Sequence, residues 1–168
     1  MVLPFKEKFP WGEPTYFREK ILAVAGYMWT TMMYPQGQGE PLIPGESFAM
    51  KGAILYPPKL HTIRKGNRWK AGDLLHMAYG VRTPNYNQFN KGIPELERVK
   101  SVQNISIKWY PGDDIHPNGS ITVGVDGKII DNVNQLAIND GFDDLLCFMK
   151  WFSKDFTGQI IHWTDLKY

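Results

Sequence analysis

The sequence predicts an α+β fold, in which helices flank a small, largely antiparallel β-barrel or curled sheet. Three observations favour this class: an amphipathic helical pattern near the start, several short strand patterns after it, and two helical patterns before a final strand. The chain has 168 residues, of which 43% are apolar and 14% aromatic. We therefore expect a single globular domain over residues 1–168 with a buried core.

The first predicted elements are a short strand or arm over residues 1–10 and a helix that follows Pro14. Proline suits the first turn of a helix, and Gly26 can end this one. An apolar stripe recurs at helical spacing through Tyr16, Phe17, Lys20, Ile21 and Val24.

Residues 27–58 are predicted to be an insertion without one long helix, because prolines interrupt them throughout. A Gln- and Gly-rich centre at residues 36–40 is expected to be flexible. The insertion is either a plain surface loop or a cap over a pocket.

The second half of the chain alternates strand and helix patterns. Strands are predicted over residues 74–79, 100–109, 120–125, 128–130 and 159–163, with a polar surface loop at 80–94. Asp126-Gly127 is a strong signal for a tight hairpin. Asn132 is expected to cap one short helix, and Asp143 to begin another.

Positive charge is concentrated between Lys59 and Lys70. This segment holds five of the 19 Lys and Arg residues and no acidic residue, whereas the other 14 face 17 Asp and Glu. A pI near 8.6 is compatible with a nucleic-acid partner without requiring one.

The basic segment has two interpretations. Arg64, Arg68 and Lys70 can neutralise phosphates while Trp69 stacks on a base, as in single-strand binding, and Tyr86 in the later loop can add a stacking surface. Alternatively, the segment is a solvated face with Trp69 buried beneath it.

Other site classes have no support in the sequence. His61, His76, His116 and His162 lack ligand spacing, so we expect no metal and no cofactor. We expect His61 and His76 to lie on neighbouring strands, and His162 to be a strand histidine with satisfied hydrogen bonds. A nucleophile elbow, a P-loop and a dinucleotide fingerprint are all missing.

Cys147, the single cysteine, cannot form an intrachain disulfide and is expected to be a buried small hydrophobe. No leader pattern opens the chain, and no apolar run approaches the roughly 20 residues of a membrane span. The expectation is a cytoplasmic protein with no membrane partner.

One set of side chains suggests nucleophilic chemistry. A Thr hydroxyl can attack if a nearby amine takes its proton, and a Lys amine can do so if its pKa is lowered. Lys59 and Thr62 are three residues apart among other cations, and Asp140 can orient them. Since positions 59 and 62 of a regular strand face opposite sides, Lys59 must precede the strand.

Four short segments together resemble the ASCH domain family, whose members share a PUA-like barrel. The segments are Ile21–Ala23, the KxHTIR pattern of Lys59–Arg64, the RWKxGD pattern ending in Trp69–Asp73, and the acidic-Gly-Phe pattern of Asp140–Phe142. They cover most of the chain in order.

The resemblance implies a barrel with flanking helices and a cleft lined by the Lys-x-x-Thr-x-Arg segment. ASCH domains are thought to bind RNA or nucleotide-like ligands, and a bacterial branch are metal-independent amidohydrolases that deacetylate acetylcytidine. By position, the resemblance implies that Thr62 attacks the amide carbonyl, Lys59 accepts the proton and Asp140 helps the leaving amine. This chain departs from the family in its insertion and in having Asp where the family has Glu.

Three functions are therefore expected candidates. The first is binding of RNA or a modified nucleoside, with Arg64, Arg68 and Lys70 at phosphate and His61, Thr62 and Trp69 at the base. The second is the amidohydrolase. The third is a protein-interaction domain that uses residues 27–58; the sequence leaves the oligomeric state open.

Overall fold

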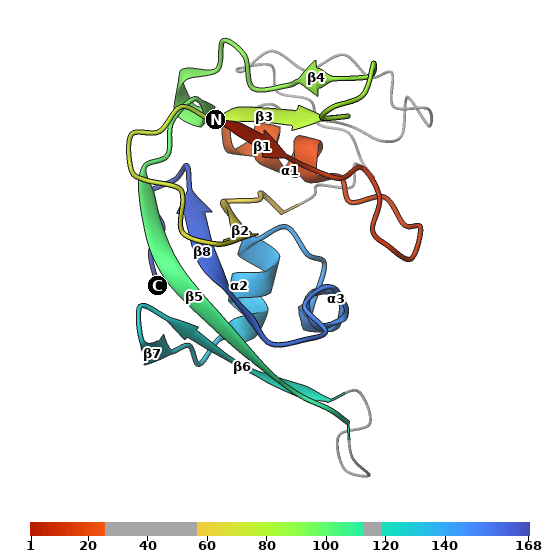
Figure 1. The fold of residues 1–168 in the computed structure, drawn as a ribbon, viewed down its shortest axis with the longest axis vertical. Helices are drawn as coiled ribbons and strands as arrows, with labels where there is room; N and C mark the ends of the chain where they lie inside the picture. The colour runs from red at the N-terminus through yellow and green to blue at the C-terminus, as the bar shows by residue number, and fades with distance from the viewer. Residues whose placement is uncertain (26–56, 113–118) are drawn as a thin grey trace, which may run out of the picture.

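The computed structural model describes residues 1–25, 57–112 and 119–168, which form a mixed α+β fold (Figure 1). The predicted α+β class is thus confirmed. The strands are β1 (Val2–Pro4), β2 (His61–Lys65), β3 (His76–Tyr79), β4 (Asn87–Gln88), β5 (Ser101–Tyr110), β6 (Ser120–Val125), β7 (Lys128–Ile129) and β8 (Phe156–His162). The helices are α1 (Phe17–Leu22), α2 (Val133–Asn139) and α3 (Leu145–Trp151), with short 3-10 turns η1 (Ala23–Ala25) and η2 (Pro94–Leu96). The insertion predicted at 27–58, except its last two residues, and His116 lie outside the described residues.

The described strands form two sheets. The larger has the order β2-β8-β5-β6-β7 and is antiparallel throughout. The smaller has the order β1-β3-β4, in which β1 runs parallel to β3 and β4 antiparallel to it. Within the described ranges, the hydrogen bonds between strands do not close either sheet into a barrel.

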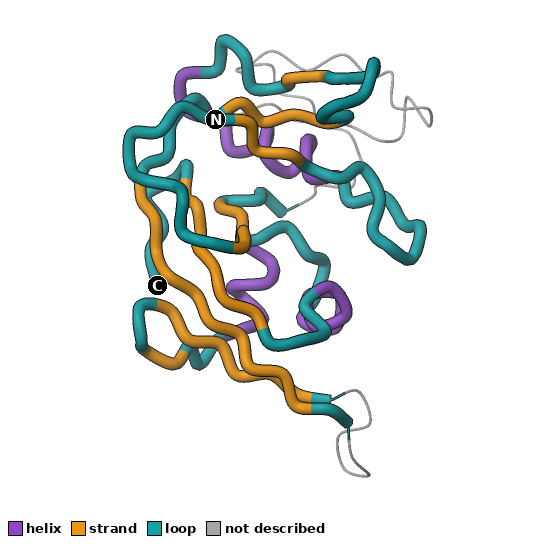
Figure 2. Tube along the Cα trace, in the orientation of Figure 1, coloured by secondary structure: helices purple, strands orange, loops and turns teal. Residues whose placement is uncertain are grey.

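Part of the core lies between the larger sheet and the helices α2 and α3, which lie together on one side of it (Figures 1 and 2), and the rest lies among the N-terminal arm, α1 and the smaller sheet. Along β5, Ile105 and Ile107 are buried, while Asn104 and Ser106, which alternate with them, are exposed. This alternation follows from the period of two in a strand. One face of the sheet therefore packs on the helices. The other face is polar around Asn104 and Ser106.

The helix starts follow from their caps. The Asn132 side chain accepts a hydrogen bond from the backbone N–H of Gln135 at 3.0 Å, as predicted for the start of α2. The prediction that Asp143 begins the next helix is wrong by two residues. Asp144 caps α3, accepting from the N–H of Cys147 at 2.7 Å, because Asp143 instead pairs with Lys20.

Other sequence predictions are confirmed or corrected by the topology. The hairpin turn at Asp126-Gly127 is present, with φ angles of 48° and 82°. The expectation that His61 and His76 lie on neighbouring strands is wrong, because β2 and β3 belong to different sheets. Cys147 is half-buried at the edge of the core. None of the helices in the described ranges has the length and apolar character to cross a bilayer.

Candidate functional site

The centre of the candidate site is an ion pair between Lys59 and Asp140. Lys59 lies just before β2, as strand alternation required, and is only 1% exposed. Its Nζ donates to Asp140 Oδ1 at 2.6 Å and also to the Asp140 backbone carbonyl. Its backbone is held as well: the N–H donates to the Lys20 carbonyl, and the carbonyl accepts from Trp163 Nε1.

A second buried lysine holds the same turn, which runs over residues 140–143 between α2 and α3. Lys20 of α1 donates from Nζ to the Gly141 carbonyl at 2.8 Å and to Asp143 Oδ1 at 2.7 Å. Gly141 has a φ of +87°, and a Cβ built there would lie 2.9 Å from Cδ of Lys59. The turn thus needs glycine both for its backbone and for the close approach of Lys59.

His61 connects the ion pair to Tyr168. Its Nδ1 lies 3.6 Å from Asp140 Oδ1, and its Nε2 lies 2.7 Å from the Tyr168 hydroxyl. The side-chain amide of Asn139 donates to the same hydroxyl at 2.9 Å. With the hydroxyl as donor to His61 Nε2, the His61 proton lies on Nδ1, towards Asp140.

Burial sets the charge states of this site. Burial lowers the pKa of Lys59 to about 8, although the Asp140 carboxylate acts in the opposite direction. Burial alone would raise the pKa of Asp140, but Lys59 and His61 hold it below its usual value. Burial likewise lowers the pKa of His61, which stays neutral at pH 7. The arrangement therefore offers an amine that loses its proton just above neutral pH.

Thr62 is not joined to this pair. It is buried, but it lies opposite Ile161 of β8, whereas His61 lies opposite His162. Successive residues of β2 face opposite sides of the sheet, so Thr62 points away from the side of His61. Across the described ranges, no hydrogen bond links Thr62 to Lys59 or Asp140. The structure thus brings together two of the three candidate catalytic residues.

The predicted ligand-binding residues fall into two groups, of which the first is structural. The Arg64 guanidinium donates to the Pro4 carbonyl at 2.6 Å and lies 5.1 Å from the centre of the Phe5 ring. The Trp69 side chain is 3% exposed, and its backbone N–H donates to Gln159 Oε1. Arg64 therefore fastens the N-terminal arm, and Trp69 has no ring face open to a base.

The second group is exposed. Arg68 and Lys70 lie in the segment after β2, next to Lys65 at the end of that strand, which the sequence did not single out. No ion pair joins these three cations to a carboxylate of the described residues. The Arg68 guanidinium lies 5.5 Å from the centre of the Trp69 ring. Tyr86 is 46% exposed on the loop before β4. These side chains remain open to a ligand.

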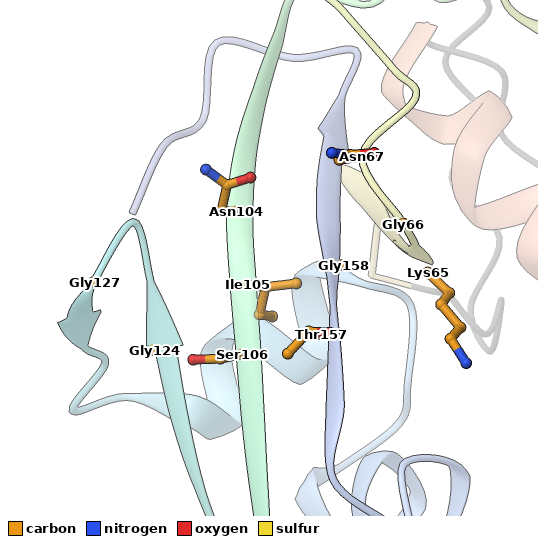
Figure 3. A pocket seen from close by; sticks show the side chains of 10 residues that line it. All are labelled: Lys65, Gly66, Asn67, Asn104, Ile105, Ser106, Gly124, Gly127, Thr157 and Gly158. Carbon is orange, nitrogen blue, oxygen red and sulfur yellow. The ribbon is translucent and has the colours of Figure 1, made fainter.

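A hollow of about 500 Å³ lies beside the same segment (Figure 3). Because Asn104 and Ser106 of β5 line it, the hollow opens on the polar face of the larger sheet. Its lining comprises Lys65, Gly66, Asn67, Asn104, Ile105, Ser106, Gly124, Gly127, Thr157 and Gly158. No carboxylate belongs to this lining.

Sequence reasoning missed several residues of the buried site. Lys20 was assigned to an apolar helix stripe, yet a lysine in such a stripe is itself a signal for a buried partner. His162 was expected to be satisfied, but both ring nitrogens are buried without a hydrogen-bond partner in the described part of the chain. Asn139 and Tyr168 carried no local signal, because their roles depend on contacts between distant segments.

Comparison with known proteins adds no assignment. No protein-family model, curated protein or solved structure matches this chain. In the described ranges, no group of three or more His, Cys, Asp or Glu side chains could hold a metal ion.

Proposed function

We propose that this protein is an ASCH-like domain of PUA-like fold that binds single-stranded RNA or a modified nucleoside. The observation that carries the proposal is that the basic segment forms one wall of the hollow. Lys65 and Asn67 of this segment line it together with Asn104 and Ser106 of β5. The volume, about 500 Å³, lies within the range of roughly 300–1,000 Å³ that is usual for small-molecule sites.

The charges and dipoles of the hollow suit different parts of a nucleotide. The amides of Asn67 and Asn104 and the hydroxyl of Ser106 offer neutral hydrogen-bonding groups for a base or a ribose. Figure 3 shows the Lys65 side chain extended away from Asn104 and Ser106. Its ammonium, with exposed Arg68, is therefore available to phosphates outside the hollow, where single-stranded RNA would continue.

The test is fluorescence anisotropy of a labelled short single-stranded RNA at several salt concentrations. Each phosphate contact to a single strand contributes a slope of roughly 0.7 in a plot of log K against log salt. Replacing Arg68 and Lys70 together by Gln should weaken binding and reduce that slope by about 1.4. A matched control, Lys8→Gln with Lys91→Gln, removes the same charge from exposed sites elsewhere. Undetectable binding at low salt, or equal loss in both double variants, would refute the proposal.

A second candidate function is a metal-independent amidohydrolase for acetylated cytidine. The Lys59–Asp140 ion pair favours it, because a lysine with a pKa of about 8 can serve as a general base near neutral pH. In this proposal water and the amide yield acetate and the free amine; Lys59 accepts the proton of the attacking hydroxyl, and Asp140 assists the leaving amine. The position of Thr62 makes its role as that hydroxyl the weakest part of the assignment.

Chromatography of cytidine released from acetylcytidine tests this candidate. Activity should rise with pH up to about 8, as Lys59 loses its proton, and should be lost in Lys59→Met and Asp140→Asn. Circular dichroism of both variants checks that they remain folded. Thr62→Val keeps the shape of the side chain but removes its hydroxyl. Full activity of this variant would show that water, and not Thr62, attacks the amide carbonyl. No turnover by the wild type would exclude this substrate.

A further inference from the structure

A second polar site lies on the other face of the larger sheet, beneath the side chain of Tyr168. Tyr168 is half-buried, whereas His61 and His162 are 0% exposed. The centre of the Tyr168 ring lies 5.4 Å from that of His61 and 6.2 Å from that of His162. The Tyr168 ring thus lies between these two histidines and the surface.

Gln103 places Tyr168 on this face. The N–H of Tyr168 donates to Gln103 Oε1 at 2.9 Å, and Gln103 Nε2 donates to the Tyr168 carbonyl at 2.8 Å. Gln103 precedes Asn104 in β5, so its side chain is on the face opposite to the hollow. The two sites are therefore separated by the sheet itself.

The histidines under Tyr168 have unused hydrogen-bonding capacity. Both nitrogens of His162 and Nδ1 of His61 are buried and lack a partner among the described residues. Their rings are 5.2 Å apart, centre to centre. Unpaired buried polar groups cost free energy and are rare in proteins. Burial also lowers the pKa of His162 to about 3, so its ring is neutral and offers one donor and one acceptor.

We infer that Tyr168 is a removable cover, and that the pocket it fills binds a flat ring with an oxygen at its edge, such as a pyrimidine base. The Tyr168 phenol itself has this chemistry, since its oxygen meets His61 Nε2 and the Asn139 amide. A pyrimidine carbonyl can accept from Asn139 while the adjacent ring N–H donates to His61. The rest of the ring edge can then meet His162.

This inference does not rest on RNA binding in the hollow, which lies on the opposite face. It does connect to the Lys59–Asp140 pair through His61, whose Nδ1 is 3.6 Å from Asp140 Oδ1. A base held in place of Tyr168 would therefore lie next to the buried amine.

Calorimetric titration with uridine tests the cover. Tyr168→Phe keeps the ring but loses both hydrogen bonds of the hydroxyl, so uridine affinity should rise about tenfold. Tyr168→Ala should raise it further. Tyr110→Phe, which removes the hydroxyl of an exposed tyrosine at the end of β5, should leave affinity unchanged. Adding His162→Phe to Tyr168→Phe should remove the gain.

Several results would overturn the inference. One is a folded Tyr168→Phe variant whose uridine affinity equals that of the wild type; this variant decides the matter even if Tyr168→Ala does not fold. Another is Tyr168→Ala that binds p-cresol but not uridine, which would indicate only a cavity shaped like the lost side chain. Retained affinity after His162→Phe would exclude His162 from the site. Variants of Arg68 and Lys70 leave this measurement unaffected, so failure here is distinguishable from failure of the RNA proposal.

Discussion

Lys59 Nζ lies 2.6 Å from Asp140 Oδ1, although 81 residues separate the two in the chain. Both side chains are almost fully buried, so neither charge has water to replace its partner. The pair therefore matters for stability mainly because removing one partner would leave the other as an unpaired charge in the core.

Removing one partner of this pair should be strongly destabilising. We expect Lys59→Met to lower the free energy of unfolding by about 3–5 kcal/mol, because Asp140 loses its counter-ion while it stays buried. Urea denaturation followed by circular dichroism measures this. The double variant Lys59→Met with Asp140→Leu should be more stable than Lys59→Met alone. Lys108→Met breaks only the exposed pair with Asp155 and should have no measurable effect.

The lowered pKa of Lys59 predicts a pH dependence of stability. Between about pH 8 and the ordinary lysine value of 10.5, the unfolded state binds a proton that the folded state has lost. Stability due to this group therefore rises with pH across that window, by at most about 1.4 kcal/mol per pH unit. Unfolding energies of wild type and Lys59→Met should accordingly diverge between pH 8 and pH 10. Parallel pH profiles would show that Lys59 titrates normally.

The lowered pKa of Asp140 predicts a loss of stability at acid pH. Since its pKa is lowered on folding, its contribution is complete above the ordinary value of 3.8 and is lost as pH falls through the folded pKa. Acid unfolding of Asp140→Asn, in which this carboxylate is absent, should therefore be less steep below pH 3.8 than that of the wild type. Identical acid transitions would contradict the burial of a charged Asp140.

Gly141 should tolerate no side chain. Gly141→Ala combines a left-handed backbone with a Cβ 2.9 Å from Cδ of Lys59. Gly72 has the same φ of +87° but no atom within 4 Å of an added Cβ. Gly72→Ala should thus cost only the backbone term of roughly 1–2 kcal/mol, and Gly141→Ala clearly more. Equal losses in thermal or urea unfolding would mean that the turn shifts freely away from Lys59.

The two arginines of the basic segment should separate stability from binding. Arg64→Gln loses the contact with Pro4 and the packing on Phe5, so it should lower the melting temperature. Arg68→Gln, at an exposed position, should leave melting unchanged and weaken RNA binding. Thermal melting and anisotropy on both variants check this; a reversed pattern would assign the ligand to Arg64.

Local features of the fold could be predicted from the sequence, because they depend on neighbouring residues. The cap at Asn132, the tight turn at Asp126-Gly127 and the short helix after Pro14 are of this kind. Strand alternation placed Lys59 before β2, and the family resemblance paired it with Asp140. The exact first and last residues of the elements were harder to predict, as the start of α3 shows. Asp143 could cap a helix in isolation, but its side chain pairs with Lys20 instead.

Tertiary structure decided which of the candidate residues can meet a ligand. A run of cations and aromatics does not state which side chains turn inward, so Arg64 and Trp69 could not be told apart from Arg68 and Lys70. The N-terminal arm and Gln159 pack against this segment and thereby hold Arg64 and Trp69 inward, whereas Arg68 and Lys70 stay exposed. The sequence by itself determined the chemistry of the basic segment, the α+β class of the protein and its local turns. The separation of Thr62 from Lys59, and the closing of Tyr168 over two histidines, arise only when strands and turns distant in the chain pack together.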